Sequence, residues 1–414
     1  MKKFVLIFVT AVAVASVSVF AAYNLPENTD ASKYENTHTM ASTVINKKSA
    51  EFTTSPNVDM TGFELTKNSP SKLNLKCVDE YQEECFPNNA YHPKVLDLGK
   101  DGWNGYRYWV SYTPYPQGND EYENPHIVAS NDLINYSEIK FSQPVLSNYK
   151  NGRCFNSDSE LVYNNDLNRL EIIWRYTDYD IDYASLLMSY SYDGNTWSKP
   201  ETFFETYDRK KEDMVSPGIV YDSGTYRVWY VNAYKVKYRE LKDGKWSKIR
   251  MCKLPYENDA FTWHIDLIKN NDKYEILTCA TEDKQDRKHM NLYYAKSDDG
   301  LKFGTAKKVL EPTGNDFDWD GNGLYRSTFM YSDGMYYVLY GGRNDAKNFG
   351  VGLLFGKDMY NLYGTNCDYI NDGVNSAGKF WTELCYKIEQ PILENMSKGE
   401  LQKNMNLELS PTWD

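Results

Sequence analysis

Short apolar runs rich in aromatic and β-branched residues alternate with polar turns of Asp, Asn and Gly from about residue 90 onward. These runs have the length of strands, and the spacing of apolar residues typical of an amphipathic helix is not sustained over a helix-length segment. The pattern therefore predicts an all-β protein.

The runs recur in five similar units. Each unit opens on a polar or proline-containing tetrad that leads into an apolar strand, at residues 91–94, 157–160, 215–218, 263–266 and 325–328. A second, aromatic strand follows each one, as in residues 226–230, and a third often ends in an Asp-Gly turn. Five units of about four strands each predict a five-bladed β-propeller. The last blade is expected to take its outer strand from residues 383–388 or from residues 63–75.

The ends of the chain differ from this repeat. Lys2 and Lys3 precede an apolar run that ends near Ala21, the pattern of a signal peptide. We therefore expect a secreted protein, extracellular or periplasmic, without a membrane span in the mature chain. The expected division is a signal peptide at 1–21, a linker with a ring-closing strand at 22–88, the propeller at 89–390 and a tail at 391–414.

Composition narrows the class of ligand. The chain carries 46 Lys and Arg against 58 Asp and Glu, a net charge of −12, which argues against nucleic acid as a partner. Aromatic residues make up 15% of the chain, and 36 of its residues are Tyr. Flat rings and carboxylates suit sugar binding, so we expect a carbohydrate substrate. We also expect the protein to be a monomer. The cysteine and histidine spacing predicts no metal ligands and no required cofactor.

In a propeller the first strand of each blade lines a central channel. Aligning the tetrads predicts two rings of residues around this channel. The first ring contains His92, Asp158, Ser216, His264 and Arg326, and the second contains Lys94, Glu160, Gly218, Asp266 and Thr328. Loops between the second and third strands should bring Glu123, Arg175, Asn232 and Arg343 to the same mouth. This concentration of titratable groups predicts one asymmetric site, although single carboxylates there would also suit strand capping or ion pairing.

Paired carboxylates beside aromatic rings are what hydrolysis of a glycosidic bond requires. The repeat, the polar tetrads and the Tyr-rich second strands resemble the five-bladed propeller glycoside hydrolases, the arabinanase, xylosidase and invertase group that includes family 43. His92-Pro93 stands where that family has Asp-Pro, which marks a divergent member. The resemblance implies an inverting glycosidase acting on a polysaccharide or oligosaccharide, with an arabinan-type furanose polymer as one candidate.

The resemblance also implies roles for individual carboxylates. Asp158 matches the general base, Asp266 the residue that tunes or orients the acid, and Glu123 the proton donor, with Glu160 as its rival. The residues expected to bind substrate are His92, His264, Trp263, Arg326, Arg343, Arg175 and Asn232. For His264 the alternatives are a strand cap or a contact, through water, to a calcium ion in the channel. Trp263 suits a core position equally well.

Two other functions remain as alternatives. A non-catalytic, lectin-like propeller would bind sugar without turnover, but it predicts similar sites on every blade, whereas these tetrads differ in chemistry. A sialidase-like hydrolase is suggested by the Ser-x-Asp-Gly turns, such as residues 191–197, but those enzymes have six blades. The Asp-Gly pairs are explained more simply by tight-turn chemistry.

Overall fold

The computed structural model describes residues 66–364, apart from 80–83, 85–88 and 146–152. This part of the chain folds into five antiparallel sheets, each containing four or five strands. The prediction of a five-bladed, all-β propeller is therefore confirmed. The expected signal peptide, the tail from 391 and the expected outer strand at 383–388 lie outside the described residues.

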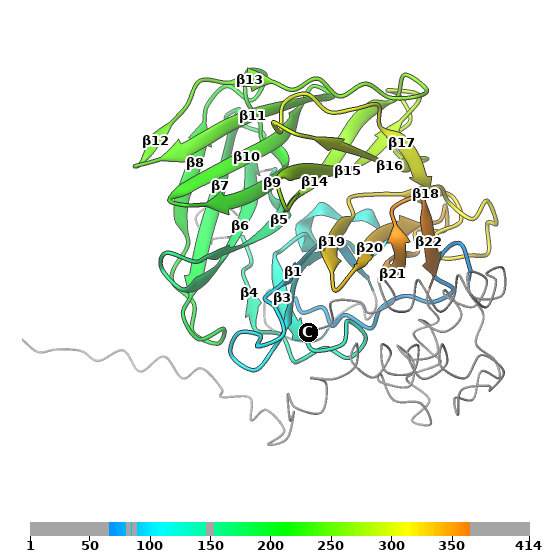
Figure 1. Cartoon of the computed structure of the whole chain (residues 1–414), viewed down its shortest axis with the longest axis horizontal. Coiled ribbons are helices and arrows are strands. Elements are labelled where there is room, and N and C mark those ends of the chain that lie inside the picture. Colours follow the sequence, from blue (N-terminus) through cyan, green and yellow to red (C-terminus); the bar gives the residue numbers. More distant parts are fainter. Residues whose placement is uncertain (1–65, 80–83, 85–88, 146–152, 365–414) are drawn as a thin grey trace, which may run out of the picture. The chain divides into compact units, whose positions relative to one another are not determined.

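The five blades follow one another along the chain (Figure 1). Blade 1 contains β1 (Ala90–Asp97), β2 (Tyr108–Pro114), β3 (His126–Ser130) and β4 (Phe141–Ser142), with the 3-10 turns η2 (Pro116–Gly118) and η3 (Asp120–Tyr122) between β2 and β3. Blade 2 contains β5 (Cys154–Asn164), β6 (Arg169–Asp178), β7 (Tyr183–Ser191) and β8 (Glu201–Thr206). Blade 3 contains β9 (Val215–Asp222), β10 (Thr225–Asn232), β11 (Lys235–Lys242), β12 (Lys245–Trp246) and β13 (Arg250–Met251). Blade 4 contains β14 (Phe261–Asn270), β15 (Lys273–Thr281), β16 (Asn291–Ser297) and β17 (Lys307–Leu310). Blade 5 contains β18 (Gly323–Leu324), β19 (Thr328–Ser332), β20 (Met335–Arg343), β21 (Phe349–Asp358) and β22 (Asn361–Gly364).

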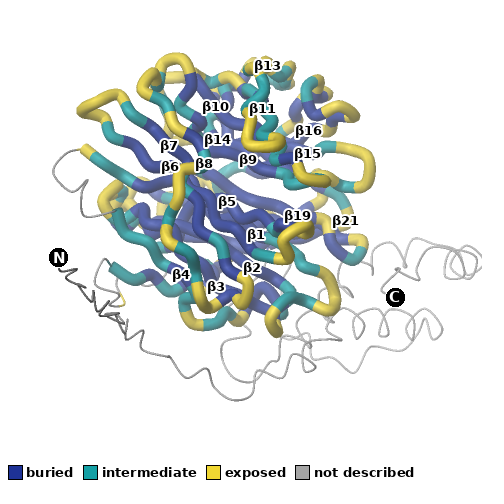
Figure 2. The backbone as a smooth tube through the Cα atoms, turned by 90° about the vertical axis from the view of Figure 1, so that its left-hand side faces the viewer, coloured by how far each residue is buried: buried dark blue, intermediate teal, exposed yellow. Residues whose placement is uncertain are grey.

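The inner strands β1, β5, β9, β14 and β19 gather around a central axis (Figure 1). Each of them contacts the inner strands of the two neighbouring blades, so the ring is continuous. Buried residues run through these strands, while exposed residues lie mainly in the turns at the edges of the sheets (Figure 2). Side chains on the inner strands are therefore held in a rigid frame.

Large aromatic side chains fill the space between blades. Trp109, Trp174 and Trp229 are almost fully buried. A Cβ atom at Gly194 would approach the Trp109 ring to 2.3 Å, and one at Gly300 would approach Trp229 to 2.8 Å. The Trp229 indole also donates to the Gly300 carbonyl at 2.6 Å. The Asp-Gly turns therefore serve blade packing, since their glycines leave room for a neighbouring tryptophan.

Every inner strand carries one extra residue relative to its partner, at the same level of the channel. In blade 1, for example, residues 92 and 93 lie opposite the single residue Tyr112. The corresponding extra residues fall at 158–159, 216–217, 263 and 325–327. Such β-bulges re-aim side chains and often lie beside functional sites. The five polar tetrads seen in the sequence are these bulges.

Within the described residues, blade 5 has an outer strand that was not predicted, and part of the expected segment 63–75 lies at the edge of this blade. The outer strand of blade 5 is β22, which comes from the same blade and follows β21 directly. Thr66 adds one antiparallel bridge to Gly364 at its edge, and Leu73 donates its N–H to the Val351 carbonyl at 2.7 Å. The prediction missed β22 because its four residues are too short to stand out as a strand. Among the described residues, no helix is long and apolar enough to cross a membrane.

Candidate functional site

The first predicted ring forms a compact, buried cluster in the channel. Ligand atoms of His92, Asp158 and His264 all lie within 4.8 Å of one another, and each residue is at most 3% exposed. The sequence predicts no metal ligands, apart from the alternative contact through water between His264 and a calcium ion, because residues from three blades have no recognisable spacing along the chain. The structure brings two imidazoles and a carboxylate together in the manner of a transition-metal site.

The bulges place these side chains at a cost in backbone strain. His92, Asp158 and Ser216 adopt φ values of 49°, 50° and 50°, a region that non-glycine residues rarely occupy. All three stand at the same position of their respective tetrads. Strained residues persist where the surrounding structure holds them, and they cluster at functional sites.

Several polar atoms of the cluster are buried without a hydrogen bond. Asp158 accepts the Ser216 N–H through Oδ2 at 3.1 Å, but its Oδ1 has no hydrogen-bond partner. Neither ring nitrogen of His264 has a hydrogen-bond partner, although Nδ1 lies 3.5 Å from Asp158 Oδ1. Buried polar atoms without partners are costly. Atoms of this type, aimed at one another, fit a bound cation.

His92 is oriented by polar groups on its other side. Its Nδ1 lies 2.8 Å from the Thr113 hydroxyl and 3.4 Å from Glu123 Oε1. If Nδ1 carries the proton, Nε2 keeps the lone pair that a cation requires, as metal-binding histidines usually arrange. Burial lowers the pKa of His92 to about 4, so its imidazole is neutral near pH 7.

The two carboxylates near the cluster differ in their protonation. Burial raises the pKa of Glu123 well above its usual value, and the negative charges of Asp158 and Asp120 raise it further. Burial also acts to raise the pKa of Asp158, but His264, Arg326 and His92 outweigh it and hold that pKa near 2. The surroundings therefore shift the two carboxyls in opposite directions, Glu123 toward the protonated form and Asp158 toward the ionised form.

The second ring forms a buried ion-pair network, which we call the channel plug. Lys94 Nζ lies 2.6 Å from Asp266 Oδ1 and 2.8 Å from Glu160 Oε1. Arg326 completes it at 3.2 Å from Glu160 Oε2 and also donates to the Ser159 and Pro217 carbonyls. Burial raises the pKa of Glu160 to about 7, with the Lys94 charge opposing it.

The channel plug joins all five inner strands. Asp266 accepts the Thr328 hydroxyl at 2.7 Å and the Phe329 N–H at 3.1 Å, which links blade 4 to blade 5. Two expected catalytic carboxylates, Glu160 and Asp266, and one expected substrate ligand, Arg326, thus lie in this network. Their charges are matched by neighbours within the channel.

The other expected substrate residues lie outside the cluster. Arg175 donates to Asp213 at 2.6 Å and to the Ser157 hydroxyl at 3.3 Å. Asn232 accepts from Lys237 and donates to the Arg209 carbonyl. Arg343 lies 3.7 Å from Asp345, with its guanidinium 5.4 Å from the Phe349 ring centroid. The Trp263 indole ring lies 5.7 Å from the His264 ring and donates to the Tyr325 hydroxyl at 3.2 Å.

Aromatic rings that the sequence analysis did not assign to the site pack around the cluster. The Tyr325 ring lies 4.4 Å from the His264 ring and stacks on Tyr91 at 5.0 Å. Tyr115 also stacks on Tyr91, with 5.7 Å between the ring centroids. Tyr325 is the first residue of the fifth tetrad. This position is the sequence feature from which its place beside the cluster could have been predicted.

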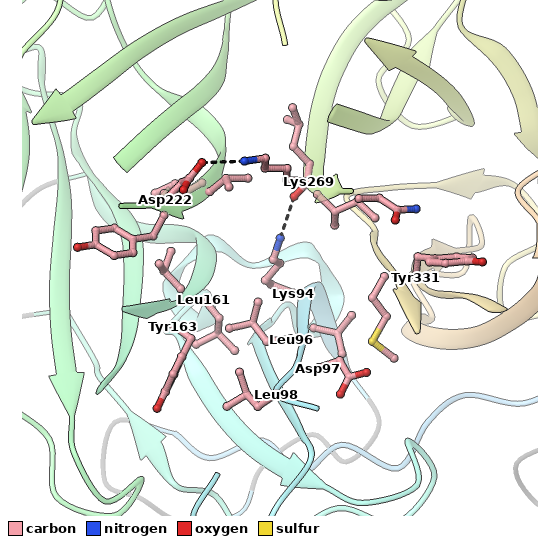
Figure 3. Close-up of a pocket in the computed structure, with 18 of the residues that line it drawn as sticks. Lys94, Leu96, Asp97, Leu98, Leu161, Tyr163, Asp222, Lys269 and Tyr331 are labelled. Atoms are coloured by element: carbon pink, nitrogen blue, oxygen red, sulfur yellow. Dashed lines mark hydrogen bonds and ion pairs between the residues drawn. The ribbon is translucent and has the colours of Figure 1, made fainter. Parts of the chain in front are cut away.

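A separate cavity of about 680 Å³ lies beyond the channel plug (Figure 3). Lys94 lies at its inner end, and its walls come from the second halves of the inner strands, including Leu96, Leu161 and Tyr163. The metal-type cluster is not among its lining residues. This cavity and the metal-type cluster therefore share no lining residue.

Comparison with known proteins supports the fold. No family model matches the chain. An A type blood N-acetyl-α-D-galactosamine deacetylase of Flavonifractor plautii is 28% identical over 299 residues, a match covering 59% of this chain and 38% of that protein. The chain therefore matches less than two fifths of the length of this curated relative.

Solved structures agree at the level of fold. The crystal structure of an N-acetylgalactosamine deacetylase from F. plautii in complex with blood group B trisaccharide has a TM-score of 0.61 and 23% identity, covering 70% of this chain and 95% of that one. A xylan β-1,4-xylosidase from Bacillus halodurans has a TM-score of 0.50 and 12% identity, covering 67% and 56%. The expected resemblance to the propeller glycosidases thus holds for the fold. The chain has a five-bladed propeller fold that also occurs in carbohydrate-active enzymes as different as a sugar deacetylase and a xylosidase.

Proposed function

We propose that this chain is a metal-dependent hydrolase that removes the N-acetyl group from an amino sugar. The observation that carries the proposal is the cluster of His92, Asp158 and His264, with three buried ligand-type atoms that lack hydrogen bonds. The name of the F. plautii relative supplies the reaction class. The match covers part of that protein, so both the activity and the substrate are proposals for this chain.

The cluster has the donors that a divalent transition-metal ion prefers. His92 and His264 supply neutral imidazoles, and Asp158 supplies an ionised carboxylate. A cation held there would polarise the acetamide carbonyl and make a bound water more acidic. This chemistry suits an amide, which is a poor electrophile without such assistance.

The side chains around the cluster supply the remaining functions. Hydrolysis forms a bond from the water oxygen to the acetyl carbon and breaks the bond from that carbon to nitrogen, giving acetate and a free amine. Glu123, whose Oε1 lies 3.4 Å from His92 Nδ1 and whose raised pKa favours the protonated form, would deliver its proton to the leaving nitrogen, and the proton that the attacking water loses would restore it. Tyr325 and Tyr115 line the cluster and orient the sugar.

Glycosidic bond cleavage is the second candidate. It is favoured by Glu123 and Asp158, a protonated and an ionised carboxyl in one site, which is the division of roles that an inverting glycosidase needs. The deacetylase proposal accounts in addition for the two histidines. It also leaves Glu160 and Asp266 as parts of the channel plug.

The test is to measure acetate and new reducing ends in parallel. The mature chain, supplied with Zn²⁺ or Mn²⁺, is incubated with blood group A trisaccharide and N-acetylgalactosamine. We expect acetate release that EDTA abolishes and that falls at least a hundredfold in His264→Ala. The matched control, His289→Ala, alters an exposed histidine and should retain full activity. Release of reducing ends without acetate would support the glycosidase, and sugar binding without either product would support a lectin.

A further inference from the structure

One tight turn at the mouth of the channel has left-handed backbone at both of its positions but contains no glycine. The two-residue turn between β10 and β11 consists of Ala233 and Tyr234, with φ values of 51° and 63°. Such turns need left-handed backbone at both positions, which favours Asn and Gly and is unfavourable for a bulky residue. The turns Ser223-Gly224, Asp243-Gly244 and Asp333-Gly334 all place glycine second. Tyr234 therefore occupies a position where glycine would relieve strain.

The ring of Tyr234 extends the row of aromatic side chains that begins at the candidate site. It lies 5.6 Å from the Trp263 ring, and its hydroxyl donates to the Lys284 carbonyl at 3.1 Å. Trp263 is the extra residue of the β14 bulge and lies directly beside His264, with 5.7 Å between ring centroids. Both rings are half-buried, so part of each is accessible to solvent.

Exposed donors flank this row. The Arg287 guanidinium lies 4.5 Å from the Trp263 ring centroid, and the Lys284 ammonium lies 4.2 Å from the ring of Phe261, the next aromatic residue of β14. Aromatic rings pack against the apolar face of a sugar, and exposed cationic side chains donate hydrogen bonds to its hydroxyls. The row therefore has the chemistry of a sugar-binding surface that starts at the site and leads outward.

We propose that Tyr234 and Trp263 bind the sugar residue adjacent to the N-acetylated one, so that the substrate is an oligosaccharide chain rather than a free monosaccharide. This inference rests on the proposed function, because the reacting sugar is placed at His92, Asp158 and His264. The strained turn holds the Tyr234 ring in place before the sugar arrives. Binding a second sugar residue is a reason for a tyrosine, instead of glycine, at this turn.

The test uses two substitutions in the same turn. Tyr234→Gly removes the ring and relieves the strain, whereas Ala233→Gly relieves strain and keeps the ring. We expect Tyr234→Gly to raise the KM for blood group A trisaccharide about tenfold, with kcat and the kinetics on N-acetylgalactosamine unchanged and the Tm not lowered. Ala233→Gly should match the wild type on both substrates. Equal losses on both substrates, or no loss on either, would overturn the proposal.

A binding experiment separates this inference from the proposed function. Calorimetric titration with the same trisaccharide needs no turnover and is run on the wild type and both variants, each in the Asp158→Asn background. Of these three proteins, only the one that carries Tyr234→Gly should bind the trisaccharide about tenfold more weakly. If no acetate is released by any protein but this difference remains, the proposed function fails and the sugar-binding surface stands. If the three proteins bind equally, or none binds, the surface is refuted.

Discussion

Asp158 has two oxygens with different surroundings, and this difference defines its role. Oδ2 accepts the Ser216 N–H, while Oδ1 faces His264 without a hydrogen bond. The residue also adopts a strained backbone conformation that a bulge imposes. A carboxylate with one oxygen anchored and the other presented to two histidines is a preorganised ligand.

Asp158→Asn should abolish turnover and leave the fold intact. The amide oxygen can still accept the Ser216 N–H, but the ligand charge that opposes a cation is lost. We expect acetate release to fall at least a thousandfold, with the Tm within a few degrees of the wild type. Acetate assays and a thermal melt test this directly. A variant with the wild-type rate would remove Asp158 from the proposed machinery.

At the scale of elements, the five bulges matter more than the strands themselves. They lie at one level of the channel, and they determine which side chains meet at the cluster and which meet in the channel plug. Directly below the cluster, Lys94 joins β1 to Glu160 of β5 and to Asp266 of β14. A buried group of matched charges is sensitive to the loss of any one partner.

Lys94→Met should therefore destabilise the propeller strongly. It leaves Glu160 and Asp266 buried with only Arg326 as a cationic partner, and we expect the free energy of unfolding to fall by about 3–5 kcal/mol. Adding Asp266→Asn to this variant should recover part of the loss. Guanidinium unfolding measures both effects.

The matched control for this substitution is Lys269→Met, which breaks a half-exposed ion pair with Asp222. Such surface pairs contribute about 0–1 kcal/mol, so the control should remain close to the wild type. If Lys94→Met were equally mild, the channel plug would not hold the inner strands together.

The bulges also explain what could be predicted from the sequence. The tetrads were visible because their polar residues interrupt apolar strands, and they placed His92, Asp158 and His264 in one ring. The same alignment predicted that the carboxylates of Glu160 and Asp266 are free to act on a substrate. Spacing along the chain does not show that Lys94 pairs with both of them. Tyr325 was missed as a neighbour of His264 because ring stacking depends on the orientation that the bulge imposes.

At the scale of the whole propeller, the contact between the first and last blades completes the ring. Arg107 of blade 1 pairs with Asp97 at 2.9 Å and with Asp333 of blade 5 at 2.7 Å. Ser332 of blade 5 donates to Asp97 as well. These ion pairs and hydrogen bonds tie the first blade to the last, so they should contribute to stability.

The network also predicts a dependence on pH. Burial acts to raise the pKa of Asp97, but hydrogen bonds from Arg107 and Ser332 outweigh it and lower that pKa in the folded protein. Its contribution is therefore present above the unfolded-state pKa and is lost as the pH falls through the lower, folded-state value. We expect Asp97→Asn to have a lower Tm near pH 7 and a smaller further decrease toward pH 3 than the wild type. Parallel curves of Tm against pH for the two proteins would contradict this role.

In the proposed site, His92, Asp158 and His264 hold one divalent cation. The most direct test is the metal content of purified residues 22–414 after saturation with Zn²⁺ or Mn²⁺ and removal of excess ion, measured by mass spectrometry. We predict one ion per chain in the wild type and in His289→Ala, and well under one tenth of that in His264→Ala. A wild type that retains no ion, or a His264→Ala variant that retains a full one, would contradict the account.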